Sequence, residues 1–500
     1  MFNFLSFLFV SCVHASRSSR SAVGVEPSSK IGLTEKSEEA TSGTVDRAPA
    51  PIDILPVGVL AQILLHAILA DAHRCDVHRH RKQELASVSR CWRDTIFDNP
   101  TFWTTINLTP QWMPSLVEAH VQRSGCLFVD VEIGLWKTPE ELDTLSMLLS
   151  IAMRCVERWR SLIFYGNSIQ MESYLRQMKD VIFPSLAYLI VDDQFNHPYS
   201  FGFKPKNMPA LDYLKIDRVT AVGALSFPPN LRILEMNNYQ AHGFPSLRLT
   251  LPSEKLTTLV LRGDGWTVDP VTIHFPHLAS LTLTIPEAKQ LLNDIVAPQL
   301  RHLRYNHHPA AENPVSVFAQ LKSKFITVTD LDIWLGATIR NTELAIVGHA
   351  IADAFPKVCH LALATTNLPV FFGQYGSEER SPAGKWSRLE CLTLLWGSLE
   401  SDTGELVSWL QRRTPKGQTM LRVQLSQEIS AHTFATYAHH SRPYQLLREC
   451  CVLEQGVNVT DSFGPNIELP QFVHQYNRIA SALRSSSESC GKCWISPGLW

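Results

Sequence analysis

One short pattern recurs along the middle of this chain and constrains its fold more than any other feature. Its unit is an apolar residue, two variable residues, an apolar residue, one variable residue and a further apolar residue, as in Leu186-x-x-Leu189-x-Val191. Ten copies follow one another at steps of 20 to 31 residues, with first positions at Trp159, Leu186, Leu211, Leu231, Leu256, Leu278, Leu300, Val328, Val358 and Leu389. A long series at a period in this range is typical of a stacked-repeat architecture.

Each copy fits a strand that is followed by a helix. Apolar residues two positions apart fall on the same face of a strand, and a proline in front of many copies, as in Phe183-Pro184-Ser185, ends the preceding element. Helix-compatible stretches lie between the copies, for example 168–181, 287–296, 341–354 and 404–413. Because one unit cannot bury its own apolar row, neighbouring units must stack. We therefore predict a curved α/β solenoid over residues 155–425.

A different pattern occupies residues 52–108. Asp53 and Pro56 precede an apolar run, which is a signal for the start of a helix. Apolar residues then recur at helical spacing at Val59, Leu60, Ile63, Leu64, Ala67 and Ile68. A polar stretch, Asp71 to Lys82, separates this run from a second helical pattern through Leu85, Val88, Trp92, Ile96 and Phe97. The sequence therefore predicts a small all-helical module, and a fold of mixed α and α/β class.

The remaining segments are assigned by composition. Residues 1–51 begin with a short apolar run and continue with Ser, Glu, Thr and Ala, which predicts a disordered segment. We expect residues 109–154 to connect the two parts and to cap the solenoid. Residues 426–479 are predicted to form a helical cap at the far end, and residues 480–500 a flexible tail rich in Ser and Gly.

Residues 53–106 resemble the F-box. The resemblance rests on Ile54-Leu55-Pro56 with Val59-Leu60 and Ile63-Leu64, on residues 85–94 (LASVSRCWRD), and on residues 99–106 (NPTFWTTI). This layout is similar to F-box proteins that mushroom-forming (basidiomycete) fungi carry in large numbers, in which irregular leucine-rich repeats follow the helical module. Residues 120–125 (HVQRSG) resemble the helix end between the two parts in that family.

The resemblance implies substrate recognition for an SCF-type ubiquitin ligase and ubiquitin-dependent degradation. The F-box would dock on the Skp adaptor, which links it to the cullin scaffold, and a leucine-rich-repeat-like solenoid would hold an unknown target protein. Carried over onto this sequence, the adaptor-binding residues are Leu55, Pro56, Val59, Leu60, Ile63, Val88 and Trp92. We expect Leu55, Pro56 and Leu60 to be exposed, whereas Val88 and Trp92 fit the core of the module. Gly58 stands where many members of the family have an acidic residue, and the stretch from Asp71 to Lys82 is longer and more basic than a minimal loop.

Two alternatives use the same fold. In the first, the protein is an interaction scaffold with a degenerate F-box that never joins a ligase. In the second, it is a secreted recognition protein, because Phe2 to Val13 is apolar and Val13-His14-Ala15 resembles a leader cleavage site, although a positively charged n-region is missing. Asn107 and Asn458 begin glycosylation sequons. The 11 cysteines are scattered, which favours a reducing compartment, the cytoplasm or the nucleus.

Several function classes are excluded or disfavoured. The net charge of −2 argues against a nucleic-acid-binding protein, and no segment is long and apolar enough for a membrane span. We find no H-E-x-x-H or G-x-S-x-G motif, so we expect no enzyme and no cofactor. No metal site is expected, because the cluster His73, Cys75, His78 and His80 is packed too tightly for one tetrahedral site and Cys490 with Cys493 is half a zinc site.

Overall fold

The computed structural model describes residues 55–70, 75–134, 136, 138–166, 174–175, 177–193, 204–217, 227–238, 247–249, 251–263, 266–268, 272–308, 310–336, 343–373, 381–395, 403–413, 420–426, 429, 440 and 442–457. Contacts between residues divide the chain into two compact units, Met1–Trp103 with Pro470–Trp500 and Thr104–Leu469. The predictions of a disordered segment at 1–51 and a flexible tail at 480–500 lie outside the described residues. We call the first unit the helical unit and the second the sheet unit.

The helical unit consists of three helices and a short 3-10 turn over its described residues. The elements are α2 (Val57–Ala70), α3 (Cys75–Ala86), α4 (Arg90–Asp98) and η2 (Pro100–Trp103). One apolar core joins them and is formed by Leu60, Ala61, Leu64, Ile68, Leu85, Trp92, Ile96, Phe102 and Trp103. The apolar spacing seen in the sequence therefore does correspond to a buried helical face.

The predicted second helix is broken in two. Ser87 Oγ donates a hydrogen bond to the Glu84 carbonyl (2.7 Å), and Ser89 Oγ accepts one from the Trp92 N–H (3.2 Å) as the N-cap of α4. Serine competes with helical backbone bonds in this way, so it favours helix ends over helix interiors. The prediction of one helical run through Leu85 and Phe97 is therefore wrong. The polar stretch before it is helical from Cys75 onward.

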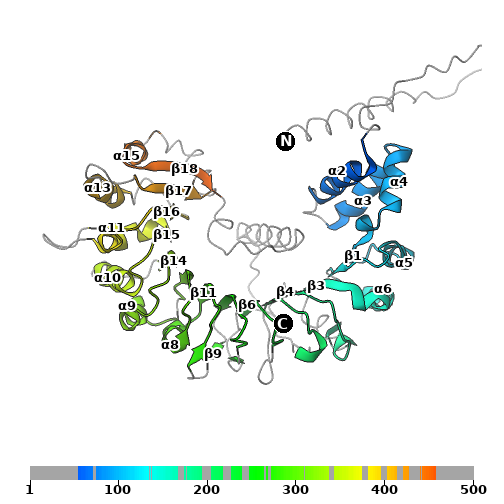
Figure 1. Ribbon diagram of the computed structural model, residues 1–500, viewed down its shortest axis with the longest axis horizontal. Coiled ribbons are helices and arrows are strands. Elements are labelled where there is room, and N and C mark those ends of the chain that lie inside the picture. Colours follow the sequence, from blue (N-terminus) through cyan, green and yellow to red (C-terminus); the bar gives the residue numbers. More distant parts are fainter. Residues whose placement is uncertain are drawn as a thin grey trace, which may run out of the picture. The chain divides into compact units, whose positions relative to one another are not determined.

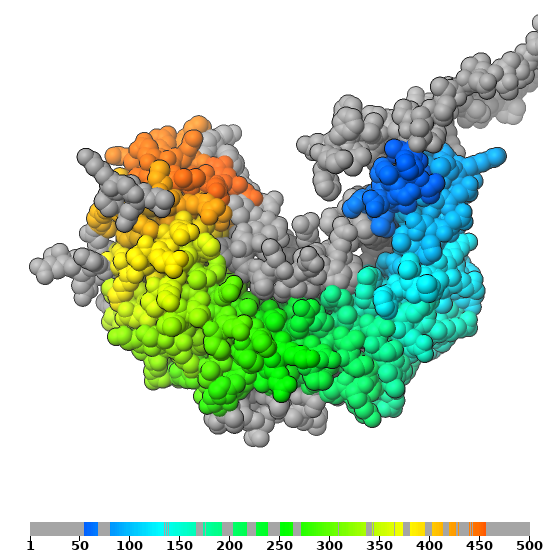
Figure 2. Space-filling view, viewed as in Figure 1, coloured from blue at the N-terminus to red at the C-terminus, as the bar shows by residue number. Residues whose placement is uncertain are grey.

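The sheet unit contains one large parallel sheet of fourteen strands. Each strand pairs with the next one along the sheet in parallel register. The order is β1 (Thr105–Leu108), β2 (Val129–Ile133), β3 (Trp159–Gly166), β4 (Tyr188–Asp193), β5 (Tyr213–Asp217), β6 (Ile233–Asn238), β8 (Thr258–Gly263), β11 (Ser280–Thr284), β13 (His302–Asn306), β14 (Asp330–Trp334), β15 (His360–Leu363), β16 (Cys391–Leu394), β17 (Arg422–Ser426) and β18 (Val452–Val457). Figure 2 shows the same order as colour bands that follow one another across this unit.

Helices of this unit lie along one side of the sheet (Figure 1). They are α5 (Pro114–Arg123), α6 (Pro139–Ala152), α8 (Ala288–Asp294), α9 (Pro314–Phe318), α10 (Leu344–Ala354), α11 (Leu368–Phe372), α13 (Gly404–Arg413) and α15 (Arg442–Cys450). Short 3-10 turns are η3 (Met153–Arg158), η4 (Pro205–Asn207), η5 (Ala319–Leu321), η6 (Thr365–Asn367) and η7 (Pro382–Lys385). Two small parallel pairs accompany the sheet, β7 (Leu247–Leu249) with β9 (Trp266–Val268) and β10 (Ile273–His274) with β12 (Ile295–Val296).

The repeated leucines form the core between the sheet and these helices. Each of the ten copies coincides with a strand, β3 to β6, β8, β11 and β13 to β16. The middle apolar residues pair strand to strand in one row, and each is fully buried: Leu162, Leu189, Leu214, Leu234, Leu259, Leu281, Leu303, Leu331, Leu361 and Leu392. The predicted strands and the mixed α/β class are therefore confirmed. The predicted helices at 287–296, 341–354 and 404–413 are found as α8, α10 and α13, whereas 168–181 lies largely outside the described residues.

The sheet extends past both ends of the predicted range of 155–425. Residues 104–108 join the sheet as β1, and the predicted connecting segment 109–154 contains β2, α5 and α6. The predicted helical cap at 426–479 contains α15 and also β18. Alternation of apolar residues at Val129, Val131 and Ile133 is the sequence signal for β2, and it is distinct from the ten-copy pattern.

Candidate functional site

The seven adaptor-binding residues implied by the resemblance lie in different environments. Val59 (45% exposed), Val88 (43%) and Pro56 are exposed, whereas Leu55 and Ile63 are partly buried. Trp92 is buried, as its fit to the module core suggested. The structure therefore leaves an exposed group of three at the start of α2 and in the turn between α3 and α4.

Two of these expectations are wrong: Val88, which was expected in the core, is exposed, and Leu60, which was expected to be exposed, is buried. Leu60 is 1% exposed and packs in the core with Leu64 and Trp92. Helical geometry explains the difference, because Leu60 and Leu64 are four residues apart and share the buried face, while Val59 is turned by about 100° toward solvent. Substitution of Leu60 would therefore damage the core and would not isolate a surface contact.

Two further exposed apolar residues belong to the same unit. Val57 is 63% exposed in the first turn of α2, and Phe97 is 40% exposed near the end of α4. Phe97 was expected in the helical core pattern, but it stays partly exposed, with its ring centroid 5.7 Å from that of Trp103. We refer to Val57, Val59, Val88 and Phe97 as the exposed apolar set. Large apolar side chains that stay exposed beside a formed core mark interaction sites when they gather on one surface.

Lys82 fixes the end of the helical unit. Its Nζ donates a hydrogen bond to the Phe102 carbonyl (2.6 Å) and lies 5.7 Å from the centre of the Trp103 ring. Trp103 Nε1 in turn donates to the Ile96 carbonyl (3.0 Å). Burial lowers the pKa of Lys82 to about 8. These contacts hold η2 against α3 and α4.

We predicted no metal site in the His and Cys cluster near residue 75 and no membrane-spanning segment. The structure describes this cluster only in part. His73 lies outside the described residues, and of Cys75, His78 and His80 only the backbone, in α3, is described. In the part of the chain that the structure describes, no group of three His, Cys, Asp or Glu side chains is placed to hold a metal ion. Its helices include none with both the length and the apolar character needed to cross a membrane. Asn107 is 4% exposed within β1, which does not fit an attached glycan.

The second candidate surface is the sheet face opposite the leucine row, which we call the polar face. Alternate residues of each strand point to it because side chains alternate along a strand. One register row passes through Ser280, His302, Asp330 and His360 on β11, β13, β14 and β15. A parallel row two residues further on passes through Thr282, Arg304, Asp332 and Ala362. Residues 20 to 30 apart in the sequence are thus direct neighbours.

Ser280, His302 and Asp330 lie side by side in the first of these rows, which sequence reasoning alone could not establish. Ser280 Oγ is 2.8 Å from His302 Nδ1, and Asp330 Oδ1 is 2.5 Å from His360 Nδ1. Burial lowers the pKa of His302 to about 4, while the hydrogen bond to Asp330 raises the pKa of His360. A base works best with a pKa near the working pH, so His302 is poorly suited to activate Ser280.

Ion pairs between neighbouring strands give the polar face a fixed arrangement. Arg160 binds Asp130 with both ends of its guanidinium, through Nε at 3.1 Å and an Nη at 2.5 Å. Ser161 Oγ donates to the same carboxylate at 2.8 Å. Bidentate pairs of this kind hold a planar geometry. Side chains on this face are therefore positioned by their neighbours and lose little freedom on binding a partner.

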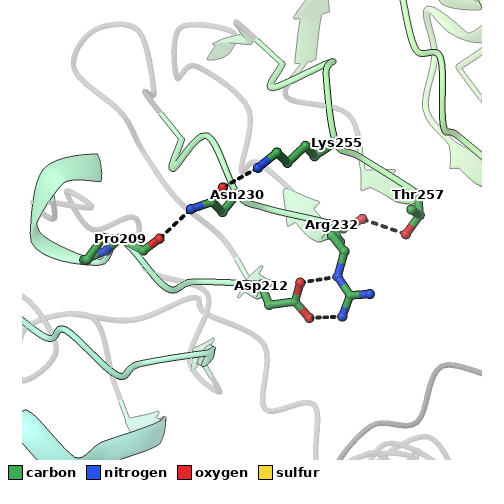
Figure 3. A network of polar contacts seen from close by, with 6 residues as sticks. All are labelled: Pro209, Asp212, Asn230, Arg232, Lys255 and Thr257. Atoms are coloured by element: carbon green, nitrogen blue, oxygen red, sulfur yellow. Dashed lines mark hydrogen bonds and ion pairs between the residues drawn. The ribbon is translucent and has the colours of Figure 1, made fainter.

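A third set of polar contacts joins the segments that lead into β5, β6 and β8 (Figure 3). Asn230, from the proline-rich lead-in of β6, donates through Nδ2 to the Pro209 carbonyl (2.8 Å) and accepts from Lys255 Nζ (2.6 Å). Beside it, Arg232 forms a bidentate ion pair with Asp212. One lead-in therefore ties three consecutive repeats together at the edge where the strands start.

The candidate site thus consists of two surfaces, each within its own unit. The exposed apolar set of the helical unit is suited to a protein partner with an apolar surface, and the polar face of the sheet unit offers ordered charged and hydroxyl groups. Neither surface requires a cofactor for these contacts. In comparisons with known proteins, the chain matches no family model, no curated protein and no solved structure.

Proposed function

We propose that this protein is the substrate-recognition adaptor of an SCF-type ubiquitin ligase. In this proposal the helical unit is an F-box that docks on the Skp adaptor, which links to the cullin scaffold, and the sheet unit is a leucine-rich-repeat-like solenoid that holds a target protein. One observation carries it: the helical unit has its own apolar core and still exposes Val57, Val59, Val88 and Phe97. Exposed apolar residues of this kind are typical of protein interaction sites.

Covering the exposed apolar set would contribute favourably to a docking contact. At about 25 cal/mol per Å² of apolar surface, covering a half-exposed valine contributes on the order of 1 kcal/mol. Val57 and Val59 come from the first turn of α2, and Val88 from the turn before α4. Because these side chains are attached to capped or packed elements, the docking surface is largely pre-formed.

The sheet unit supports the capture of a target. Its fourteen parallel strands place side chains at about 4.8 Å intervals across the polar face. An adaptor of this kind catalyses no reaction itself. It acts by raising the effective concentration of the target beside the ligase. Ubiquitin transfer would be carried out by its partners.

Co-purification with the Skp adaptor tests this function. We would compare wild type with Val59→Glu and with Val88→Glu, each of which places a charge on an exposed apolar position. The matched control is Gln83→Glu, which adds the same charge at an exposed position of α3. We expect both valine variants to lose most of the adaptor while the control retains it, with circular dichroism showing the same helical content throughout.

The outcomes separate the alternatives. Equal recovery of the adaptor by all variants would overturn the assignment of the docking residues. Failure of correctly folded wild type to recover any adaptor would overturn the ligase function and favour an interaction scaffold with a degenerate F-box. The secreted alternative predicts a mass that corresponds to cleavage after Ala15, which intact-mass measurement of the native protein decides.

A further inference from the structure

Charge is unevenly distributed over the sheet unit, although the whole chain has a net charge of only −2. All strands of the large sheet are parallel, so the segments that lead into them lie along one edge, which we call the strand-start edge. The four segments before β13, β14, β15 and β16 (297–301, 319–329, 355–359 and 381–390) contain six Lys or Arg residues and one acidic residue, Glu390. The strand-start edge is therefore basic over these neighbouring strands.

Four of these basic residues have free side chains. Arg301, Lys322, Lys357 and Arg388 are exposed, and no hydrogen bond or ion pair to any described residue holds their charged groups. The other two are occupied: Lys385 pairs with Asp353 at 2.6 Å, and Lys324 donates to backbone carbonyls of α8. Together with Glu390, these four residues leave a net positive charge on neighbouring lead-in segments, which raises the local concentration of negatively charged groups.

Over the same four strands, the described residues that follow the strand ends include two acidic residues and no Lys or Arg. Glu312 accepts a hydrogen bond from Lys289 Nζ (2.7 Å), and Glu343 accepts one from Asn313 Nδ2 (2.8 Å). The excess of positive charge over these strands therefore lies at the strand-start edge. A charged edge of this kind orients a partner of opposite charge and speeds association more than it adds affinity.

The backbone under the basic residues is fixed by hydrogen bonds between neighbouring segments. Thr329 N–H donates to the Arg301 carbonyl (2.9 Å), Cys359 N–H to the Thr329 carbonyl (2.8 Å), and Glu390 N–H to the Cys359 carbonyl (2.8 Å). Four strands at a spacing of about 4.8 Å extend over roughly 15 Å, which an extended peptide of about five residues also spans. Three carboxylates on alternate residues of such a peptide would extend over about the same width.

We propose that the strand-start edge over β13 to β16 binds an acidic segment of the target protein through Arg301, Lys322, Lys357 and Arg388. This assignment rests on the proposed function, because it names the chemistry by which the sheet unit recognises its target. The partner is an extended stretch rich in Asp or Glu. The contacts are charge-assisted hydrogen bonds, which makes the interaction sensitive to salt.

Fluorescence anisotropy with a labelled peptide of ten glutamates tests the proposal on the full-length protein. The charge-reversed variant is Lys322→Glu, Lys357→Glu and Arg388→Glu combined. The charge-conserving control is Lys322→Arg, Lys357→Arg and Arg388→Lys combined. We expect the reversed variant to bind at least tenfold more weakly than wild type at 50 mM NaCl, the control to bind like wild type, and wild-type affinity to fall when NaCl is raised to 200 mM.

A milder variant shows whether misfolding of the charge-reversed protein causes its loss of binding. Lys357→Ala with Arg388→Ala removes two exposed charges and should weaken binding by a smaller factor than the reversal, with the same urea midpoint as wild type. Equal affinity of wild type and both weakened variants would overturn the proposal. Tighter binding of a ten-nucleotide oligothymidine than of the glutamate peptide would also overturn it, in favour of nucleic acid. Since no Skp adaptor is present in this assay, its failure is distinct from failure of the ligase function.

Discussion

Arg304 and Asp332 face each other from β13 and β14 on the polar face of the sheet and form an ion pair that is almost closed to water. The Asp332 side chain is 3% exposed, and that of Arg304 is 29% exposed. The second carboxylate oxygen of Asp332, Oδ1, is buried and accepts no hydrogen bond from the described residues. Burial raises the pKa of Asp332, and the neighbouring guanidinium of Arg304 opposes that rise. The carboxylate thus depends on a single cation.

Removal of the Arg304 guanidinium should destabilise the folded protein. Arg304→Met leaves a buried charge without compensation, so we expect the free energy of unfolding to fall by about 3–5 kcal/mol. The double variant Arg304→Met with Asp332→Leu removes both charges and should restore most of the loss, because a buried pair is often replaceable by apolar residues. Urea unfolding curves of the three proteins measure the effect. A double variant no more stable than the single one would show that the pair itself stabilises the sheet.

His302 should make the sheet unit sensitive to acid. The folded-state pKa of His302 is about 4, below its ordinary value of 6.5, because the ring is buried beside Ser280 and Arg304 and faces Asp330. Between these pH values the unfolded chain binds a proton that the folded chain does not bind. The free energy of unfolding should therefore decrease as pH falls from 6.5 toward 4, by up to about 1.4 kcal/mol per pH unit.

Titration of the neighbouring His360 changes the free energy of unfolding with pH in the opposite direction. Its effect must therefore be separated from that of His302. Hydrogen bonding to Asp330 raises the pKa of His360, so its contribution to stability is complete below pH 6.5 and is lost as pH rises through the raised value. We would compare urea midpoints from pH 4.5 to 7.5 for wild type, His302→Asn and His360→Asn. The slope between pH 5 and 6.5 should flatten in His302→Asn. An unchanged slope in that variant would rule out His302 as its source.

The repeats of the sheet unit could be predicted because their apolar residues obey a local rule. A row of buried leucines needs apolar side chains at fixed positions of each strand, and that requirement is visible without knowing which strands pair. The contacts on the polar face could not be predicted from such a local rule. Arg304 and Asp332 are 28 residues apart, and the steps between copies vary from 20 to 31 residues, so only the register of the folded sheet shows which charges meet.

In the helical unit, the sequence could not show which apolar residues are exposed. Helical periodicity identified Leu60, Leu64 and Trp92 as apolar positions, but a short amphipathic helix does not reveal from sequence which of two adjacent residues, Val59 or Leu60, is turned to the core. The break at Ser89 was missed because serine occurs both inside helices and as a cap. As a consequence of this break, Val88 is exposed in the turn rather than buried in a continuous helix.

Lys82 should give the helical unit a pH dependence in the alkaline range. Its folded-state pKa of about 8 is below the ordinary 10.5 because the ammonium group is buried near Phe102 and Trp103. Between pH 8 and 10.5 the unfolded chain binds the extra proton, so the free energy of unfolding should increase as pH rises through this range. Lys82→Met, of similar length and without charge, should abolish that increase. Urea unfolding followed by circular dichroism at pH 7.5, 8.5 and 9.5 measures both proteins, and parallel curves would contradict the assignment.

At Gly348 the packing between helices of the sheet unit leaves no room for a side chain. This glycine lies in α10, and a Cβ atom there would come 2.3 Å from the Val370 carbonyl oxygen of α11 and 2.7 Å from Cγ of Pro382. A backbone carbonyl and a proline ring cannot yield as a flexible side chain would. Overpacking of this kind costs about 1–3 kcal/mol, which exceeds the gain of up to about 1 kcal/mol that alanine brings to a helix. Gly348→Ala should therefore destabilise the protein.

Gly404 provides the matched control, because it begins α13 and nothing lies within 4 Å of a Cβ placed on it. Gly404→Ala should leave the urea midpoint unchanged or raise it slightly, since alanine is the better helix former. The comparison separates close packing between α10 and α11 from a general effect of replacing glycine. Similar midpoints for the two variants would mean that α10 can shift away from Val370 and Pro382 at little cost, and that successive repeats are packed less rigidly than their contacts indicate.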